Sequence, residues 1–139
     1  MIILDTNVVS ESMRRQPARE VLAWLASQPA AELFTTSITQ AEVLFGIERL
    51  PEGERRQKLK GWARDMFAQD FKGRILAFGG DAADYYASIR AARERLGRPG
   101  PPQDIQIAAI ARLHRAAVAT RNLADFVGCG VELINPWTA

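Results

Sequence analysis

The run Ile2-Ile3-Leu4-Asp5-Thr6-Asn7 decides the fold, because it joins a short apolar segment to three polar residues that favour caps and turns. A fully apolar segment without alternation is typical of a strand buried on both faces, as in a parallel sheet. The run therefore predicts a strand over residues 2–4, with Asp5 directly at its carboxyl end.

Outward from this strand, short apolar segments alternate with longer amphipathic ones. Further strands are predicted at residues 33–35, 75–78, 117–120 and 131–134. Helices are predicted at residues 18–26, from Thr39 to near Pro51, and at 54–70, 81–96 and 104–114. This alternation favours the α/β class, as a three-layer α/β/α sandwich around a mostly parallel central sheet of four to five strands. With no internal repeat, residues 1–139 are interpreted as a single domain.

Acidic or amide side chains stand next to these apolar segments. Asp5 follows the first strand, Glu42 stands early in the helix after the second strand, and Asp104 begins a nearly all-apolar helix. Asn122 and Asp125 follow a later strand. Parallel strands connected by crossovers end at the same edge of the sheet, where ligands of such sheets bind. The pattern predicts one shared acidic site at this edge.

A cluster of carboxylates needs a compensating charge. Two unit charges about 4 Å apart repel by about 4 kcal/mol at an effective dielectric of about 20. Such a cluster raises its own pKa values or binds a cation. With one histidine, His114, and one cysteine, Cys129, the chain has no soft-ligand set for zinc. Oxygen ligands indicate Mg²⁺, with Mn²⁺ as a substitute, and a water activated by the metal as the nucleophile.

Each of these side chains also has a purely structural explanation. Four of them can cap a turn or a helix: Asp5, Asp104, Asn122 and Asp125. Thr39-x-x-Glu42 matches a capping box, in which Glu42 bonds back to the backbone N–H of Thr39. His114, late in its helix, is interpreted as a partner of the helix dipole rather than as a base.

The composition fits a nucleic-acid partner in a reducing compartment. The net charge is only +2, but the 18 basic residues are 15 arginines and 3 lysines. The planar guanidinium suits phosphate recognition, although an arginine-rich proteome gives the same bias. No apolar run reaches the roughly 18 residues of a membrane span, and Asp5 interrupts the apolar start of a secretory signal. Cys129 has no partner for a disulfide, so a cytoplasmic protein is expected.

Five stretches of the chain, in order, resemble the motifs of a known family. They are Leu4-Asp5-Thr6-Asn7, Thr39-Gln40-Ala41-Glu42, Pro102-Gln103-Asp104, Thr120-Arg121-Asn122 and residues 131–137. Together they resemble PIN-domain ribonucleases and, more narrowly, the VapC/FitB-like toxins of type II toxin–antitoxin modules. The likeness extends from one end of the chain to the other.

That resemblance implies a Mg²⁺- or Mn²⁺-dependent endoribonuclease that cleaves structured RNA of the tRNA or rRNA class. By match, Asp5, Glu42 and Asp104 are catalytic residues and metal ligands, and Thr6 orients Asp5 and water. The resemblance also implies a homodimer and a small cognate antitoxin, with contacts to both around residues 40–70. Within that segment, Trp62 is predicted by its spacing to face the core.

The fourth acidic position departs from the family pattern. Many relatives have an aspartate two residues past the equivalent of Thr120, whereas this chain has Asn122. An amide supplies an oxygen but no charge, so Asp125 is the candidate for the missing metal ligand. Both residues are kept as catalytic candidates.

Arginines near these motifs are candidates for binding the RNA backbone, with a solvated helix face as the alternative explanation. They are Arg90, Arg93, Arg95, Arg98 and Arg121.

Three other readings compete with a nuclease. A haloacid-dehalogenase-like phosphatase needs a second acid two residues after the first, where this chain has Asn7, and a downstream lysine that is missing. A receiver domain lacks its lysine and paired acids in the same way. A catalytically weak or inactive PIN-fold module that only binds RNA or antitoxin remains open, because of Asn122.

Overall fold

The computed structural model describes residues 1–139, and its centre is a five-stranded, all-parallel sheet. The strands are β1 (Ile2–Leu4), β2 (Leu33–Thr36), β3 (Ile75–Leu76), β4 (Ala117–Ala119) and β5 (Leu133–Ile134). Their order is β3-β2-β1-β4-β5. In the central strand β1, Ile3 lies beside Phe34 of β2 and Val118 of β4. The predicted parallel sheet is therefore confirmed.

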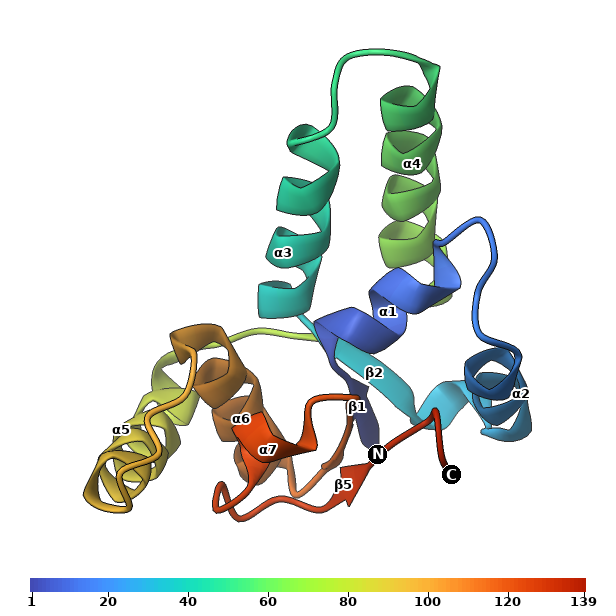
Figure 1. Cartoon of the computed structure of the whole chain (residues 1–139). Coiled ribbons are helices and arrows are strands. Elements are labelled where there is room, and N and C mark those ends of the chain that lie inside the picture. Colours follow the sequence, from blue (N-terminus) through green and yellow to red (C-terminus); the bar gives the residue numbers. More distant parts are fainter.

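Seven helices surround the sheet (Figure 1). They are α1 (Thr6–Ser12), α2 (Arg19–Ser27), α3 (Ser37–Glu48), α4 (Glu54–Asp65), α5 (Gly80–Arg95), α6 (Pro102–His114) and α7 (Leu123–Phe126). A 3₁₀ turn (Ala30–Glu32) precedes β2, and a π-helical segment (Met66–Asp70) continues α4. No helix combines the length and the apolar character that crossing a bilayer requires.

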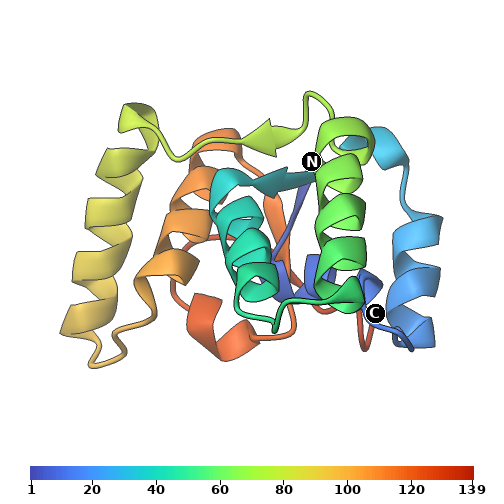
Figure 2. The ribbon, with the colours of Figure 1, turned by 90° about the horizontal axis from the view of Figure 1, so that it is seen from above.

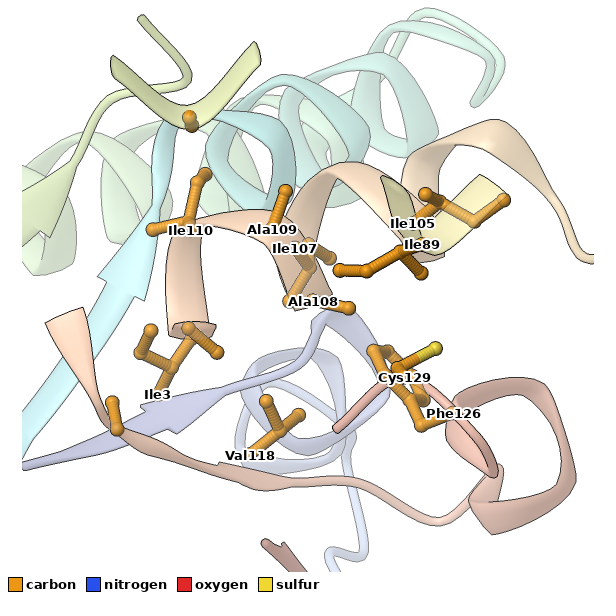
Figure 3. Close-up of a cluster of buried hydrophobic side chains, with 13 residues drawn as sticks. Ile3, Ile89, Ile105, Ile107, Ala108, Ala109, Ile110, Val118, Phe126 and Cys129 are labelled. Atoms are coloured by element: carbon orange, nitrogen blue, oxygen red, sulfur yellow. The ribbon is translucent and has the colours of Figure 1, made fainter. Parts of the chain in front are cut away.

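Two separate apolar cores cover the two faces of the sheet. Successive residues of a strand point to opposite faces, so Ile3 and Val118 pack against α5, α6 and α7, whereas Leu4 and Ala119 pack against α1 to α4. Figure 3 shows the first core, where α6 contributes the largest share of buried side chains. Two cores with a sheet between them make a three-layer α/β/α sandwich, which confirms the predicted fold class.

Helices α3 and α4 form an antiparallel hairpin that projects from the sheet (Figures 1 and 2). Glu48 at the end of α3 holds the hairpin together, because it pairs with Arg56 at 2.5 Å and with Lys60 at 3.1 Å. Exposed ion pairs contribute at most about 1 kcal/mol each. Most of the hairpin's anchoring therefore comes from the buried apolar side chains of its two helices, such as Val43, Ile47 and Ala63.

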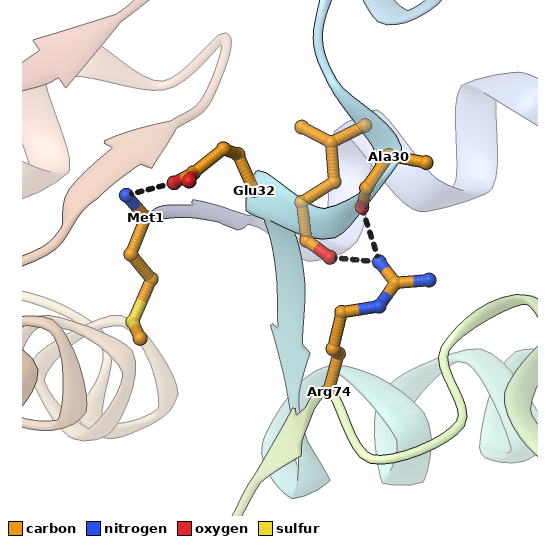
Figure 4. A network of polar contacts seen from close by, with 5 residues as sticks. Met1, Ala30, Glu32 and Arg74 are labelled. Carbon is orange, nitrogen blue, oxygen red and sulfur yellow. Dashed lines mark hydrogen bonds and ion pairs between the residues drawn. The ribbon is translucent and has the colours of Figure 1, made fainter.

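At the amino edge of the sheet, polar contacts join three neighbouring segments (Figure 4). The Met1 amino group pairs with Glu32 at 2.7 Å. The Arg74 guanidinium donates to the carbonyls of Ala30 and Leu33. These contacts tie the starts of β1, β2 and β3 together at the edge opposite the acidic residues.

Some local predictions were wrong. The polar residues after β1 favour caps and turns, and Asp5 is indeed an N-cap, but no helix is predicted where Thr6 begins α1, which buries Val8 and Val9. Helix α3 begins at Ser37 rather than at Thr39, because Thr36 accepts the backbone N–H of Thr39 and caps the helix. Trp62 was expected in the core but is 47% exposed.

Candidate active site

The acidic residues lie at the carboxyl edge of the sheet, at the point where its connections reverse. From β1 the chain builds outward through β2 and β3, and then returns to place β4 on the other side of β1. Ligands of open α/β sheets bind at such a switch point. Asp5 directly follows β1, Thr120 directly follows β4, and Asp104 lies in the first turn of α6.

Asp5 is buried, at 3% exposure, and held by three donors. Its carboxylate accepts from the Thr120 hydroxyl at 2.7 Å, the Thr6 backbone N–H at 2.8 Å and the Asn7 side chain at 3.2 Å. Burial raises the pKa of Asp5 above its ordinary 3.8, while these hydrogen bonds oppose the rise and the charge of Asp125 adds to it. Asp5 also occupies the N-cap of α1, as the capping explanation expected. The carboxylate is thereby fixed in one orientation.

Thr120 is the main residue that the sequence did not identify as part of the site. Its buried hydroxyl donates to Asp5 and accepts the backbone N–H of Asn122 at 3.0 Å. The Asn7 side chain also reaches this hydroxyl, at 3.3 Å, so Thr120 and Asn7 join the ends of β1 and β4. A small polar residue immediately after an apolar strand was the available signal for Thr120.

Glu42 is held by a chain of hydroxyl groups rather than by a capping box. The Thr6 hydroxyl donates to Glu42 Oε1 at 3.1 Å and lies 3.1 Å from the Thr39 hydroxyl. Because Thr6 has only one hydroxyl proton and gives it to Glu42, Thr39 is the donor to Thr6. The explanation of Glu42 as part of a capping box is wrong, since Thr36 caps this helix. Thr6 thus orients Asp5 through its backbone and Glu42 through its side chain.

Glu42 and Asp104 both have raised pKa values. Burial raises the pKa of Glu42 above its ordinary 4.5, partly offset by the Thr6 hydrogen bond, and the charge of Asp5 adds to the rise. For Asp104, burial and then the charges of Asp5, Asp125 and Glu42, with hydrogen bonding to Asp125, raise the pKa from 3.8 to about 7. This rise occurs although a helix N-terminus stabilises an anion. The four carboxylates are therefore close enough to repel one another.

Two residues are candidates for the fourth acidic position, Asn122 at the N-cap of α7 and Asp125 within α7. Asn122 is exposed, stands at the N-cap of α7 and makes no side-chain capping bond. Asp125 is half-buried, and its charge acts on both Asp104 and Asp5. The negative charge that Asn122 lacks is thus present at Asp125.

The carboxylate oxygens of the site are the kind of ligand that a hard divalent cation prefers. No three His, Cys, Asp or Glu side chains are arranged as they stand to hold a metal ion. Mg²⁺, however, usually keeps several waters and contacts the protein through one or two carboxylates. Four mutually repelling carboxylates without a neighbouring basic partner would be relieved by such an ion.

Arg121 is the basic residue next to the acidic edge. Its backbone N–H donates to Asn7 Oδ1 at 3.2 Å, and its exposed guanidinium lies over the Trp137 ring at 4.9 Å from the centroid. Arg90 is exposed on α5, where it bonds Tyr86 at 2.8 Å, and Arg98 is exposed in the following loop.

Arg93 differs from the other arginines because it is only 3% exposed. Its guanidinium donates to the carbonyl of Val127 and lies 3.9 Å from Cys129 Sγ. A side chain so enclosed holds α5 against the segment after α7, and its burial does not fit the expected contact with RNA.

The sequence matches the PIN domain family over residues 2–126. The chain therefore belongs to the PIN-domain family, as its motifs suggested. It is 39% identical over 137 residues to VapC ribonuclease Y4jK of Sinorhizobium fredii, covering 99% of this chain and 98% of that protein. It is 38% identical over 137 residues to toxin FitB of Neisseria gonorrhoeae, covering 99% of each.

The fold agrees with these relatives. FitAB bound to an IR36 DNA fragment aligns with a TM-score of 0.93 at 38% identity, covering 99% of this chain and 96% of that one. Within the PIN-domain family, the chain is one of the VapC/FitB-like toxins of toxin–antitoxin systems.

Proposed function

We propose that the protein is a Mg²⁺-dependent endoribonuclease, with Mn²⁺ as a substitute, and the toxin of a type II toxin–antitoxin module. The observation that carries this proposal is the group of four carboxylates at the switch point of the sheet, where the pKa of Asp104 reaches about 7. The relative from Sinorhizobium fredii is named a ribonuclease. RNA of the tRNA or rRNA class is the proposed substrate.

Asp5 and Asp104 are the proposed direct metal ligands, with Asp125 and Glu42 completing the acidic shell. A bound Mg²⁺ would lower the pKa of a water molecule and polarise the scissile phosphate. Thr120 and Asn7 hold the carboxylate of Asp5 in place by hydrogen bonds at 2.7 and 3.2 Å. Such support of a ligand is worth about 10–100-fold in metal affinity or activity.

Glu42 is the proposed proton acceptor. It is half-buried, its pKa lies above the ordinary value, and the Thr6 hydroxyl fixes one of its oxygens. A general base works best when its pKa approaches the working pH. The other oxygen of Glu42 remains available for a water molecule.

A cognate antitoxin and a second copy of the chain are the proposed protein partners. Solved relatives are toxin–antitoxin complexes such as FitAB. On α3 two large apolar side chains are exposed, Phe45 at 63% and Leu44 at 38%. An exposed apolar pair of this kind on a projecting helix supports a homodimer contact.

Metal-dependent cleavage of RNA by the purified protein tests the proposal. We expect Asp5→Asn and Asp104→Asn each to abolish cleavage without unfolding the protein, because they remove charge from a repelling cluster. Asp81→Asn, in the first turn of α5, is the matched control and should cleave normally. Retained cleavage in the double variant would refute the mechanism.

Glu42→Gln separates the proton acceptor from a merely structural residue. Gln keeps the acceptor for the Thr6 hydroxyl but cannot take a proton, so we expect cleavage to fall while stability is unchanged. A wild-type protein that binds RNA or antitoxin but never cleaves with Mg²⁺ would instead support the inactive binding module. Growth arrest on expression, relieved by the antitoxin and absent in Asp5→Asn, would support the toxin.

A further inference from the structure

A continuous groove leads away from the acidic edge between α1 and the α3–α4 hairpin. Its inner part, about 220 Å³, is lined by residues that include Glu42, Ser10 and Gly46. Its outer part, about 510 Å³, is the largest hollow described on the molecule and lies beside α4. The two parts share four lining residues: Met13, Arg14, Arg55 and Leu59. One end of the groove is therefore at a proposed catalytic residue.

The outer groove carries an excess of positive charge. Its walls contain Arg14, Arg15, Arg55 and Lys58 against a single acid, Glu54. Only Arg14 has a carboxylate within 4 Å, Glu11 at 3.3 Å, and the other three cations are unpaired.

The pairing along α4 separates the groove side of the helix from the hairpin side. Arg56 and Lys60 pair with Glu48 of α3 and do not line the outer groove. Arg55 and Lys58 point to the groove and have no such partner. Glu48 thus neutralises Arg56 and Lys60 of α4, whereas Arg55 and Lys58 have no carboxylate partner.

An exposed aromatic side chain lies among these cations. Trp62 lines the outer groove and is 47% exposed, although its spacing predicted a core position. Bases of single-stranded nucleic acid stack on aromatic side chains in positively charged grooves, and every base offers a face to stack on. An aromatic ring flanked by unpaired cations matches that arrangement.

We propose that a single-stranded segment of the RNA lies in this groove, with phosphates on Arg55, Lys58 and Arg15 and one base stacked on Trp62. This inference rests on the proposed nuclease function and extends it by naming the path of the substrate beyond the acids. The groove opens directly toward Glu42, so a strand lying in it would bring a phosphodiester to the acidic edge. In the outer part of the groove four cations stand against three apolar residues and one acid, which favours a polyanion there over an apolar peptide, whereas half of the residues that line the inner part are apolar.

Binding of a short, fluorescein-labelled single-stranded RNA of mixed sequence, measured by anisotropy in EDTA, tests the path without any need for cleavage. Each lost phosphate contact lowers the slope of log affinity against log salt by about 0.7 for a single strand. We expect this change in Arg55→Ala and in Lys58→Ala. Lys72→Ala is the matched control, because Lys72 is exposed in a turn outside the groove, and its slope should equal that of the wild type.

Trp62 gives an independent measurement. Trp62→Ala should weaken binding about fivefold to a hundredfold with no change in the salt slope, because stacking releases no counterions. Trp62→Phe keeps an aromatic face and should recover most of the affinity. Equal losses in both variants would indicate lost packing rather than stacking and would contradict the assignment.

Gly46 allows the groove to be narrowed without changing charge. A Cβ added there meets no atom within 4 Å, so Gly46→Ala should fold as the wild type does. The longer side chain of Gly46→Leu would project into the inner groove and should raise the KM for RNA cleavage more than tenfold. An unchanged KM would place the RNA elsewhere.

The failure of this inference can be told apart from failure of the nuclease proposal. Wild-type protein without Mg²⁺-dependent cleavage, but with RNA affinity that depends on Arg55 and Trp62, would overturn only the nuclease proposal. If the wild type cleaves normally but substitutions of Arg55 and Trp62 leave RNA affinity unchanged, only the proposal that RNA lies in the groove would be overturned. Loss of antitoxin binding, with RNA affinity intact, would assign the groove to a protein partner and overturn the inference.

Discussion

Replacing Asp104 with asparagine should stabilise the metal-free protein. The carboxyl group of Asp104 is half-buried, and its pKa of about 7 results from burial and from the charges of Asp5, Asp125 and Glu42. The unfolded chain exerts none of these effects, so the group ionises there with its ordinary pKa of 3.8. Asparagine has nearly the same shape and removes the charge.

The sign and size of the effect follow from linkage. A carboxyl pKa that is raised by folding penalises the folded state above 3.8, increasingly up to about 7, and by a constant amount beyond it. The difference between the folded and unfolded pKa of Asp104 corresponds to a destabilisation of about 4 kcal/mol, at 1.36 kcal/mol per pKa unit. Since the side chain is only half-buried, solvent screening reduces this to about 1–2 kcal/mol. Stability of the wild type should therefore fall as the pH rises from 4 to 7.

Urea unfolding in EDTA at pH 8 and pH 5 measures this difference. At pH 8, Asp104→Asn should be about 1–2 kcal/mol more stable than the wild type, and at pH 5 the gain should be smaller, because part of the Asp104 carboxyl is then protonated in the folded protein. Asp81→Asn, also in the first turn of a helix but exposed, should show no gain at either pH. A variant that is no more stable than wild type at pH 8 would refute the crowding of charges at the site.

Three other predictions concern the groups around the site. Mg²⁺ at 100 times its Kd should stabilise the wild type by about 2.7 kcal/mol in thermal or urea unfolding and leave the Asp5→Asn/Asp104→Asn variant unaffected; equal stabilisation of both would place the ion elsewhere. Thr120→Val keeps the shape of the buried side chain but removes the donor to Asp5, so cleavage should fall about 10–100-fold, and an unchanged rate would remove Thr120 from the site. Thr36→Ala removes the cap of α3 and should lower the free energy of unfolding by about 1 kcal/mol in urea; no change would mean that the cap is replaced by water.

The sheet was predictable because its strands are short and mainly apolar, and because the central strands β1 and β4 are almost fully buried. The segments around Ile3, Phe34 and Val118 differ sharply from the amphipathic helices between them, and their alternation fixes the layered class. The order of the strands could not be predicted, because it depends on contacts between distant residues, such as Leu4 and Ala119, that no local sequence pattern encodes.

The acids were predictable as a set, but their hydrogen bonds were not. The spacing of Thr39 and Glu42 matched a capping box, yet α3 begins two residues earlier, which frees Glu42 for Thr6. Thr6 and Glu42 are 36 residues apart. Thr120 is 115 residues from Asp5, so its role appears only when β1 and β4 lie side by side.

Arg93 and Trp62 were misplaced for a related physical reason. Neither the helical spacing of Trp62 nor the nearness of Arg93 to the Asp104 motif indicates whether a neighbouring segment covers the side chain. The segment after α7 encloses Arg93 through the carbonyl of Val127, whereas nothing covers Trp62 at the outer groove.

The hydrogen bond between Asp5 and Thr120 also sets when the site can first exist. During translation the hydroxyl of Thr120 that orients Asp5 is made 115 residues after Asp5, and the carboxylate of Asp125 follows five residues later. A growing polypeptide whose later residues still lie in the ribosomal exit tunnel has no assembled acidic edge. The site can therefore assemble only after both β1 and β4 have left the tunnel.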